Sequence, residues 1–419
     1  MSKIKSVTGR EIIDSRGNPT VEVICELLGG TTARASVPSG ASIGVHEVLE
    51  LRDHDQKRYG GLGVLTAVRN VNDEISRCVK DREFDQQTLD QALVELDGTA
   101  NKSRIGANAT LGVSLSFARA KSIEEGVELY QYLGGLVHNK DFKLPQPMFN
   151  IINGGKHADS GLDIQEFMVV PIDFKTIREK IQSAAEIISA LRKILKEKGH
   201  TTSVGDEGGF TPKLSSNEEG LEFIVQAIEG AGYSTEIVKI GVDAAASSFY
   251  NDDNDGSYRL RIAGQEISTD SAGMVDWYEK LVGAYPIISI EDGLAEDDWE
   301  GFTNLTKRLG NKVCVIGDDL TVTNIERIKI AFEKKSLNSV IIKPNQIGTL
   351  METLRAIELT KEQHWTPVVS HRSGETTDTF IADLAVGLSC DYIKSGSLVR
   401  GERVCKYNRL MEIEDMINI

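Results

Sequence analysis

Three carboxylates occupy equivalent points in the sequence, because Asp243, Glu291 and Asp318 each end a short apolar run. Carboxylate oxygens, without cysteine and without histidine at zinc-like spacing, are the ligands that a hard cation such as Mg²⁺ prefers. One acidic residue at such a point is better explained as the cap of the following helix. Three in successive runs favour a metal site.

Two lysines occupy the same kind of position. Lys343 ends an apolar run that begins at residue 340, and Lys394 follows Tyr392 and Ile393. A lysine there would direct its ammonium group toward the supposed metal. We expect its neighbours and partial burial to lower its pKa, so that it could act as a base. A salt bridge to one of the carboxylates explains either lysine equally well, and both explanations stay open.

A polar loop after the run 367–369 suits an anionic substrate. It reads Ser370-His371-Arg372-Ser373-Gly374-Glu375. An arginine flanked by hydroxyl groups, with a glycine that lets backbone N–H groups approach, predicts an oxyanion or phosphate cradle. The alternative is an arginine in solvent, which is less expected at the end of a strand.

Three further loops could complete such a site. Residues 205–210 place Glu207 beside two glycines, and a carboxyl group in an enclosed site can stay protonated and act as an acid. The loops 153–157, which contains His157, and 39–44 are rich in small residues and could exclude water as lids. A plain turn explains each of these loops when it is taken alone.

The elements that would position these residues follow a strand-then-helix alternation from about residue 145 onward. The strand-like runs are 148–152, 167–170, 203–205, 237–243, 287–291, 313–318, 340–343, 367–371 and 392–394. This alternation predicts a parallel sheet, either open and doubly wound or closed as a (β/α)₈ barrel. Nine runs are enough to close a ring, and catalytic groups gather at the C-terminal strand ends of a barrel, so the barrel is favoured. The longest interval, after Asp243, predicts an inserted excursion at 252–262.

The first 135 or so residues have a different pattern. Alternating apolar residues from Val21 to Leu27, the turn Gly29-Gly30 and the return at 31–37 predict a β-hairpin. Helix-like stretches follow at 64–79, 87–96 and 107–126. We therefore predict two domains, residues 1–135 and 136–419.

Composition excludes several classes of protein. The 419 residues include 63 acidic and 47 basic side chains, which gives a formal charge of −16 and argues against nucleic acid as the main partner. No run approaches the roughly 18 apolar residues of a membrane span, and the first residues do not resemble a signal peptide. The five scattered cysteines fit reduced thiols, so we expect a cytoplasmic location. A surface or secreted pool stays open.

At these positions the sequence resembles the enolase family along almost its whole length. The matching segments are 13–22, 39–44, 153–157, 165–168, 204–210, 289–293, 317–320, 342–348, 370–375 and 394–396. The resemblance implies an N-terminal α+β capping domain, followed by an α/β TIM-like (β/α)₈ barrel whose first strands depart from strict alternation. It also implies Mg²⁺-dependent conversion of 2-phosphoglycerate to phosphoenolpyruvate and water, with two Mg²⁺ per active site, in a homodimer or an octamer.

The resemblance also implies roles for individual residues. Lys343 would be the base and Glu207 the acid. Asp243, Glu291 and Asp318 would hold the tighter metal, while Ser42, with the substrate phosphate, would help to hold the second. The residues that would surround the substrate are His157, Gln165, Glu166, Lys343, Ser370, His371, Arg372, Ser373 and Lys394.

This sequence departs from the family pattern at three positions. Ile43 replaces a threonine beside Ser42, Val45 replaces a glutamate, and Thr377 stands where the family usually has glutamate. The change at Ile43 puts the closing behaviour of the small-residue loop in question. Two rival functions remain: a superfamily member acting on another carboxylate substrate, and a non-catalytic enolase-like structural or adhesion module.

Overall fold

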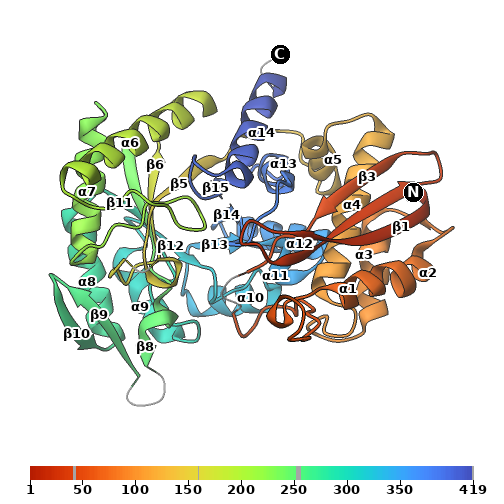
Figure 1. Cartoon of the computed structure of the whole chain (residues 1–419), viewed down its shortest axis with the longest axis horizontal. Coiled ribbons are helices and arrows are strands. Elements are labelled where there is room, and N and C mark those ends of the chain that lie inside the picture. Colours follow the sequence, from red (N-terminus) through yellow and green to blue (C-terminus); the bar gives the residue numbers. More distant parts are fainter. Residues whose placement is uncertain (41–43, 159, 252–255, 418–419) are drawn as a thin grey trace.

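The computed structural model describes residues 1–40, 44–158, 160–251 and 256–417. An antiparallel sheet with helices forms the N-terminal part, and a closed barrel surrounded by helices forms the rest (Figure 1). This is the predicted α/β architecture. No helix within the described ranges is long and apolar enough to cross a membrane.

The N-terminal sheet has the strand order β3-β2-β1-β4. Its strands are β1 (Ser2–Ile13), β2 (Pro19–Leu27), β3 (Thr32–Ser36) and β4 (Glu83–Phe84). The pairing of β2 with β3 confirms the predicted hairpin, whose alternating residues Val21, Val23, Cys25 and Leu27 are fully buried. Strand β1, which pairs along most of its length with β2, was not predicted.

The three predicted helices of this part are confirmed. The first divides into α1 (Leu65–Asn70), a π-helical turn (Val71–Ile75) and α2 (Ser76–Val79), and it is followed by α3 (Gln86–Asp97) and α4 (Ala107–Glu125). Helix α3 begins at a reciprocal cap between Asp85 and Thr88, and it ends at Gly98, whose positive φ of 71° favours glycine.

Eight strands close the barrel in the order β11-β12-β13-β14-β15-β5-β6-β7. They are β5 (Gln146–Asn153), β6 (Glu166–Pro171), β7 (Val238–Asp243), β11 (Ile287–Glu291), β12 (Cys314–Gly317), β13 (Ser339–Ile342), β14 (Thr366–Ser370) and β15 (Tyr392–Lys394). Strand β6 is antiparallel to both of its neighbours, which confirms the expected departure in the first strands. A small apolar core that includes Met148, Met168 and Ile341 fills the barrel.

One predicted strand is wrong. The run 203–205 forms a loop with an isolated bridge between Val204 and Phe210. Because β6 pairs directly with β5 and β7, the ring already closes with eight strands and has no place for a ninth.

Helices cover the outside of the barrel. They are α6 (Ile177–Glu197), α7 (Asn217–Gly230), α8 (Ser271–Ala284), α9 (Trp299–Leu309), α10 (Ile325–Lys334), α12 (Leu350–Glu362), α13 (Phe380–Gly387) and α14 (Gly401–Ile417). The short helix α11 (Pro344–Ile347) instead follows β13 directly and places Gln346 against Asp318. The predicted excursion after β7 is a small antiparallel sheet of β8 (Tyr250–Asn251), β9 (Ser257–Ile262) and β10 (Gln265–Thr269), although residues 252–255 lie outside the described ranges.

The N-terminal part packs against the barrel near the carboxyl ends of its strands. Ser39 and Gly374 form a bridge between the two parts, and the Thr110 hydroxyl donates to the carbonyl of Gly348. Helix α5 (Leu129–Leu136) buries Leu129 and Leu133 in the same core as the barrel helices. The domain boundary at 135/136 stays a prediction.

Candidate active site

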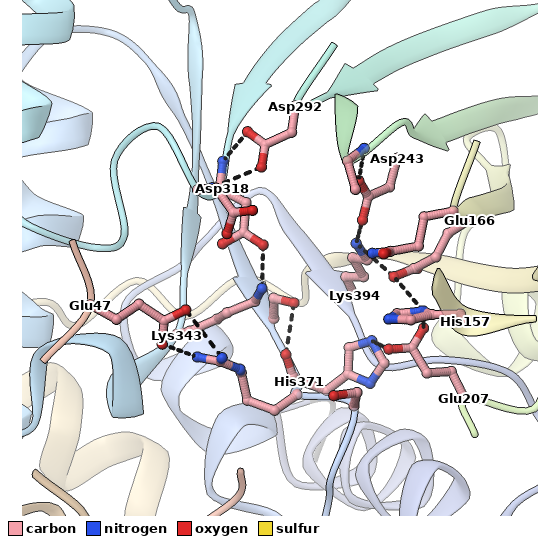
Figure 2. A pocket seen from close by; sticks show the side chains of 16 residues that line it. Glu47, His157, Glu166, Glu207, Asp243, Asp292, Asp318, Lys343, His371 and Lys394 are labelled. Carbon is pink, nitrogen blue, oxygen red and sulfur yellow. Dashed lines mark hydrogen bonds and ion pairs between the residues drawn. The ribbon is translucent and has the colours of Figure 1, made fainter. Parts of the chain in front are cut away.

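A cavity at the carboxyl ends of the barrel strands gathers most of the residues predicted to do chemistry (Figure 2). Its lining consists of Glu47, His157, Gln165, Glu166, Glu207, Asp243, Ala245, Asp292, Asp318, Asp319, Lys343, Ser370, His371, Arg372, Ser373 and Lys394. Glu291 contacts Lys394 beside this cavity. Ser42 lies outside the described residues.

The three predicted metal ligands come from adjacent strands. Asp243 ends β7 and pairs in register with Glu291, which ends β11, while Asp318 follows the last residue of β12. Their exposed fractions are 4%, 0% and 8%. Parallel neighbours bring their ends to the same edge, so local chain direction explains why the three carboxylates gather.

Lys394 lies among these carboxylates. The Lys394 ammonium donates to Asp243 Oδ2 at 2.9 Å and to Glu291 Oε1 at 2.9 Å, and it lies 3.2 Å from Glu166 Oε1. Burial lowers the pKa of Lys394, but attraction to Asp243, Glu166 and Glu291 exceeds it and leaves that pKa well above its ordinary value. Lys394 is therefore a cation held inside a ring of acids.

The residues present fit a divalent cation. All three predicted ligands offer oxygen atoms, which suit Mg²⁺. Burial, followed by repulsion from Asp243, raises the pKa of Glu291 well above its ordinary value, so added positive charge would relieve a real electrostatic strain.

A second acidic group lies beside them. Asp292, Asp318 and Asp319 have ligand atoms within 4.8 Å of one another among the described residues. Asp292 accepts hydrogen bonds from the backbone N–H groups of Asp318 at 2.9 Å and of Asp319 at 2.8 Å. Its carboxylate therefore holds the turn after β12 and orients Asp318, a function that the sequence pattern did not separate from metal binding.

The predicted pKa shift of Lys343 is wrong in direction. Its ammonium forms an ion pair with Asp318. Burial is the largest single effect on Lys343 and lowers its pKa, but attraction to the surrounding carboxylates, Asp318 first and then Glu291, leaves the net pKa above its ordinary value. The salt-bridge explanation therefore holds in this structure, and Lys343 keeps its proton as long as Asp318 faces it.

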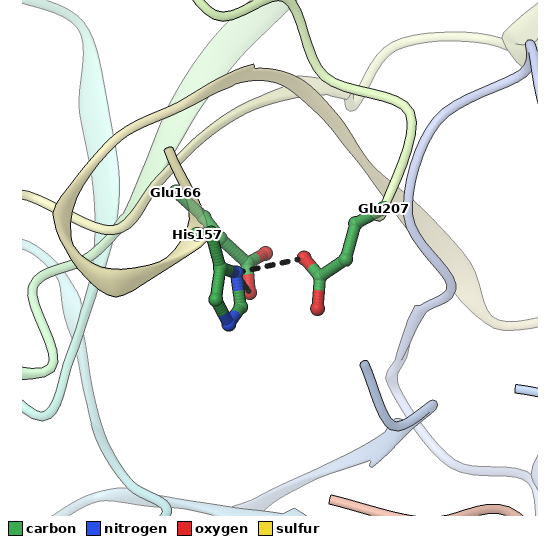
Figure 3. Close-up of side chains that lie close together, drawn as sticks. All are labelled: His157, Glu166 and Glu207. Atoms are coloured by element: carbon green, nitrogen blue, oxygen red, sulfur yellow. Dashed lines mark ion pairs between the residues drawn. The ribbon is translucent and has the colours of Figure 1, made fainter. Parts of the chain in front are cut away.

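The acid loop also differs from its prediction. Glu207 is 2% exposed, but it lies 3.4 Å from His157 Nδ1 (Figure 3). It also accepts a hydrogen bond from Asn150 Nδ2 at 3.0 Å. Burial raises the pKa of Glu207, but His157 and His371 together lower it well below its ordinary value. The expectation of a protonated Glu207 is wrong because two imidazoles face it.

Two neighbours of Glu207, namely Glu166 and His157, favour their protonated forms. Burial, with repulsion from Glu207, raises the pKa of Glu166 well above its ordinary value. Burial lowers the pKa of His157, but Glu207 outweighs it and raises that pKa. His157 Nδ1 lies 3.4 Å from Glu207 Oε2 and 4.0 Å from Glu166 Oε1, so the charge of each group affects the pKa of the others.

The predicted cradle after β14 is buried in the cavity wall. Ser370, His371, Arg372 and Ser373 are 2%, 2%, 5% and 8% exposed. The alternative of an arginine in solvent is therefore excluded. The Arg372 guanidinium donates to both carboxylate oxygens of Glu47, at 2.8 and 3.2 Å.

A fully buried arginine on helix α14 organises this cradle. Arg403 Nη1 lies 2.6 Å from His371 Nδ1 and donates to the carbonyl of Arg372, while Nη2 donates to the carbonyl of Ser373 at 2.7 Å. Because a guanidinium cannot accept, Nδ1 of His371 must be the acceptor and Nε2 must carry the hydrogen. That nitrogen lies 3.9 Å from Glu207 Oε1.

Comparison with known families agrees with this geometry. Residues 4–133 match the family described as enolase, N-terminal domain, and residues 141–418 match enolase, C-terminal TIM barrel domain. The chain belongs to the enolase family.

The predicted residue Gln165 lies beside the metal ligands of this enolase-family site, because its backbone N–H donates to the carbonyl of Asp243.

Three other residues near this site were missed by the sequence analysis. Glu47, Asn150 and Arg403 were not singled out. Glu47 and Asn150 stand in segments next to matching motifs, whereas Arg403 stands in an ordinary charged helix, so its sequence offers no signal.

Two of the three departures from the family pattern, Val45 and Thr377, lie away from the cavity lining. Val45 is 73% exposed, and Thr377 is exposed. Ile43 lies outside the described residues.

Proposed function

We propose that the chain catalyses the reversible dehydration of 2-phospho-D-glycerate to phosphoenolpyruvate and water, as the Mg²⁺-dependent hydro-lyase of glycolysis and gluconeogenesis. The observation that carries this proposal is the division of the cavity. Lys343 with its carboxylates lies on one side, and Glu207 with His157 lies on the other (Figure 2). Such a division suits removal of a proton and departure of a hydroxyl group from opposite parts of one small substrate.

Two Mg²⁺ would bind at this site. Asp243, Glu291 and Asp318 would hold the tighter one, and Ser42 together with the substrate phosphate would help to hold the second. Bound cations supply positive charge where negative charge builds up on the substrate carboxylate as its alpha proton leaves. A lysine base combined with such cations is the known arrangement of the enolase superfamily.

Lys343 is proposed as the base that takes the alpha proton. The proton lies next to a carboxylate and is very weakly acidic, so the base must be neutral when it acts. Asp318 raises the pKa of Lys343, and Asp318 is also a proposed metal ligand. Lys343 will therefore give up its proton more readily when the Asp318 carboxylate is otherwise engaged.

Glu207 is proposed as the general acid. Hydroxide is a poor leaving group, so its oxygen needs a proton as the bond to carbon breaks. Glu207 is itself the most acidic member of its cluster, but Glu166 and His157 hold protons beside it. They would supply the proton that Glu207 delivers, and the cluster would be recharged from water after each turnover.

The remaining predicted residues would bind the substrate. Arg372 with Ser370, His371 and Ser373 would contact the phosphate and the adjoining oxygens. Gln165 and Lys394 would complete the wall between these residues and the metal ligands. Local cations in a buried cavity outweigh a distant net charge of −16, because salt screens charges beyond about 8–10 Å.

One assay tests the proposal directly. The purified chain is mixed with 2-phosphoglycerate and Mg²⁺, and the ultraviolet absorbance of phosphoenolpyruvate is followed. Product that depends on Mg²⁺ and disappears with chelator is expected. Absence of product over a range of Mg²⁺ concentrations would leave the two rival functions, a different carboxylate substrate or a non-catalytic module.

We also propose that the chain works in the cytoplasm as a homodimer or an octamer. The support is family membership together with the acidic composition and unpaired cysteines. Light scattering of the purified protein tests the oligomeric state.

A further inference from the structure

Glu47, in the N-terminal part, contacts the proposed phosphate-binding arginine, Arg372. Its side chain is 4% exposed, and that of Arg372 is 5% exposed. Glu47 Oε2 accepts from Arg372 Nη1 at 2.8 Å and Glu47 Oε1 accepts from Nη2 at 3.2 Å (Figure 2). Two parallel hydrogen bonds of this kind fix both the plane and the rotation of a guanidinium.

The ion pair is tied to the metal side of the cavity through one amide. Gln346 Nε2 donates to Asp318 Oδ1 at 2.9 Å and lies 3.5 Å from Glu47 Oε1. Asn345 Oδ1 accepts a further hydrogen bond from Arg372 Nη1 at 3.2 Å. A continuous polar chain therefore runs from Arg372 through Glu47 and Gln346 to Asp318.

We propose that Glu47 is a positioning residue that orients Arg372 relative to Asp318, and that it does so while weakening anion binding. The inference rests on the proposed function, because it takes Arg372 as the contact of the substrate phosphate. A carboxylate next to an anion site repels the anion in the ground state. By orienting Arg372, the Glu47 carboxylate should raise kcat, because turnover falls steeply when groups of the site are misplaced by about 1 Å.

This combination predicts opposite changes in two measured quantities. In Glu47→Gln the amide keeps the size of the side chain, but it loses the charge and offers the guanidinium one acceptor oxygen. We expect kcat to fall by about 10- to 100-fold because Arg372 is less well oriented. We expect inorganic phosphate to bind several-fold more tightly, measured both as a competitive inhibitor and by calorimetry.

Two variants make the experiment specific. Glu352→Gln breaks another ion pair between the two parts of the chain, with Lys102 at 3.0 Å, and it should change neither quantity. Glu47→Asp keeps the negative charge but is one methylene shorter, so it should lower kcat and leave phosphate affinity within about twofold of the wild type. Thermal unfolding of each variant shows whether it is folded.

The outcomes separate the inference from the proposed function. Unchanged kcat and unchanged phosphate affinity in Glu47→Gln would show a bystander. Parallel losses in both quantities would show that Glu47 only maintains the fold. If the wild-type chain formed no phosphoenolpyruvate, the proposed function would be wrong, but the inference about Glu47 could still be tested by phosphate binding. Weaker or unchanged phosphate binding in Glu47→Gln would overturn that inference.

Discussion

Replacing Lys394 with methionine should make the stability of the protein strongly dependent on Mg²⁺. Lys394 places its ammonium 2.9 Å from Asp243 and 2.9 Å from Glu291, and 3.2 Å from Glu166. Methionine has a similar shape without charge. Lys394→Met therefore leaves three buried carboxylates without their common cation.

The size of the effect follows from these contacts. At an effective dielectric constant of about 20, each contact at 2.9 Å corresponds to roughly 6 kcal/mol of attraction, most of which is offset by the cost of burying the charge. Removing one partner of a buried ion pair typically costs about 3–5 kcal/mol. For cooperative unfolding of a chain of this length, that lowers the Tm by roughly 3–6 °C.

Millimolar Mg²⁺ should restore most of this loss, because the cation binds to the carboxylates of the folded state without competition from the lysine. Differential scanning calorimetry in chelator and in Mg²⁺ measures both values. Lys361→Met is the matched control, since the Lys361 ammonium donates to the backbone carbonyls of Leu388 and Ser389. Equal Tm shifts for Lys394→Met with and without Mg²⁺ would refute the idea that these carboxylates bind the metal.

Three further predictions concern the acid and the base, the cradle after β14, and the stability of the fold. Glu207→Gln should still exchange the alpha proton of 2-phosphoglycerate with D₂O while forming almost no product, whereas Lys343→Ala should do neither; proton NMR showing the reverse pattern would exchange their roles. Arg403→Lys should lower kcat by about 100-fold by misplacing the cradle, and it should change the ¹⁵N shifts of the His371 imidazole, whose constancy would contradict the proposed tautomer. Burial raises the pKa of Asp90 to about 7, so between about pH 4 and 7 the folded state binds a proton that the unfolded chain has released. The free energy of unfolding should therefore fall by up to about 4 kcal/mol as the pH rises through this range. Urea titrations of Asp90→Asn should lack this contribution.

Local patterns were sufficient to predict most of the elements of the fold. The alternation in β2 and the apolar runs of β7, β11 and β13 could be recognised because burial of one or both faces determines residue type along a strand. The strand β1 was missed, since its mixed burial gives no regular alternation.

Ring closure could not be predicted strand by strand. The run 203–205 has strand-like composition, but whether it joins the barrel depends on the other strands. It is left out because β6 pairs directly with both β5 and β7. Hydrogen-bond partners in a sheet are chosen by topology, so a short run with glycine can become a loop when every edge is already paired.

The sequence by itself determined which acids and bases at the strand ends gather at the cavity, because residues at the carboxyl ends of parallel strands must share one edge. The tertiary structure alone decided the charge state of each group. Asp318 raises the pKa of Lys343, and His157 and His371 lower that of Glu207, which reverses both expectations from sequence. A pKa depends on burial and on charges within a few ångström, and the order of residues in the chain does not specify either.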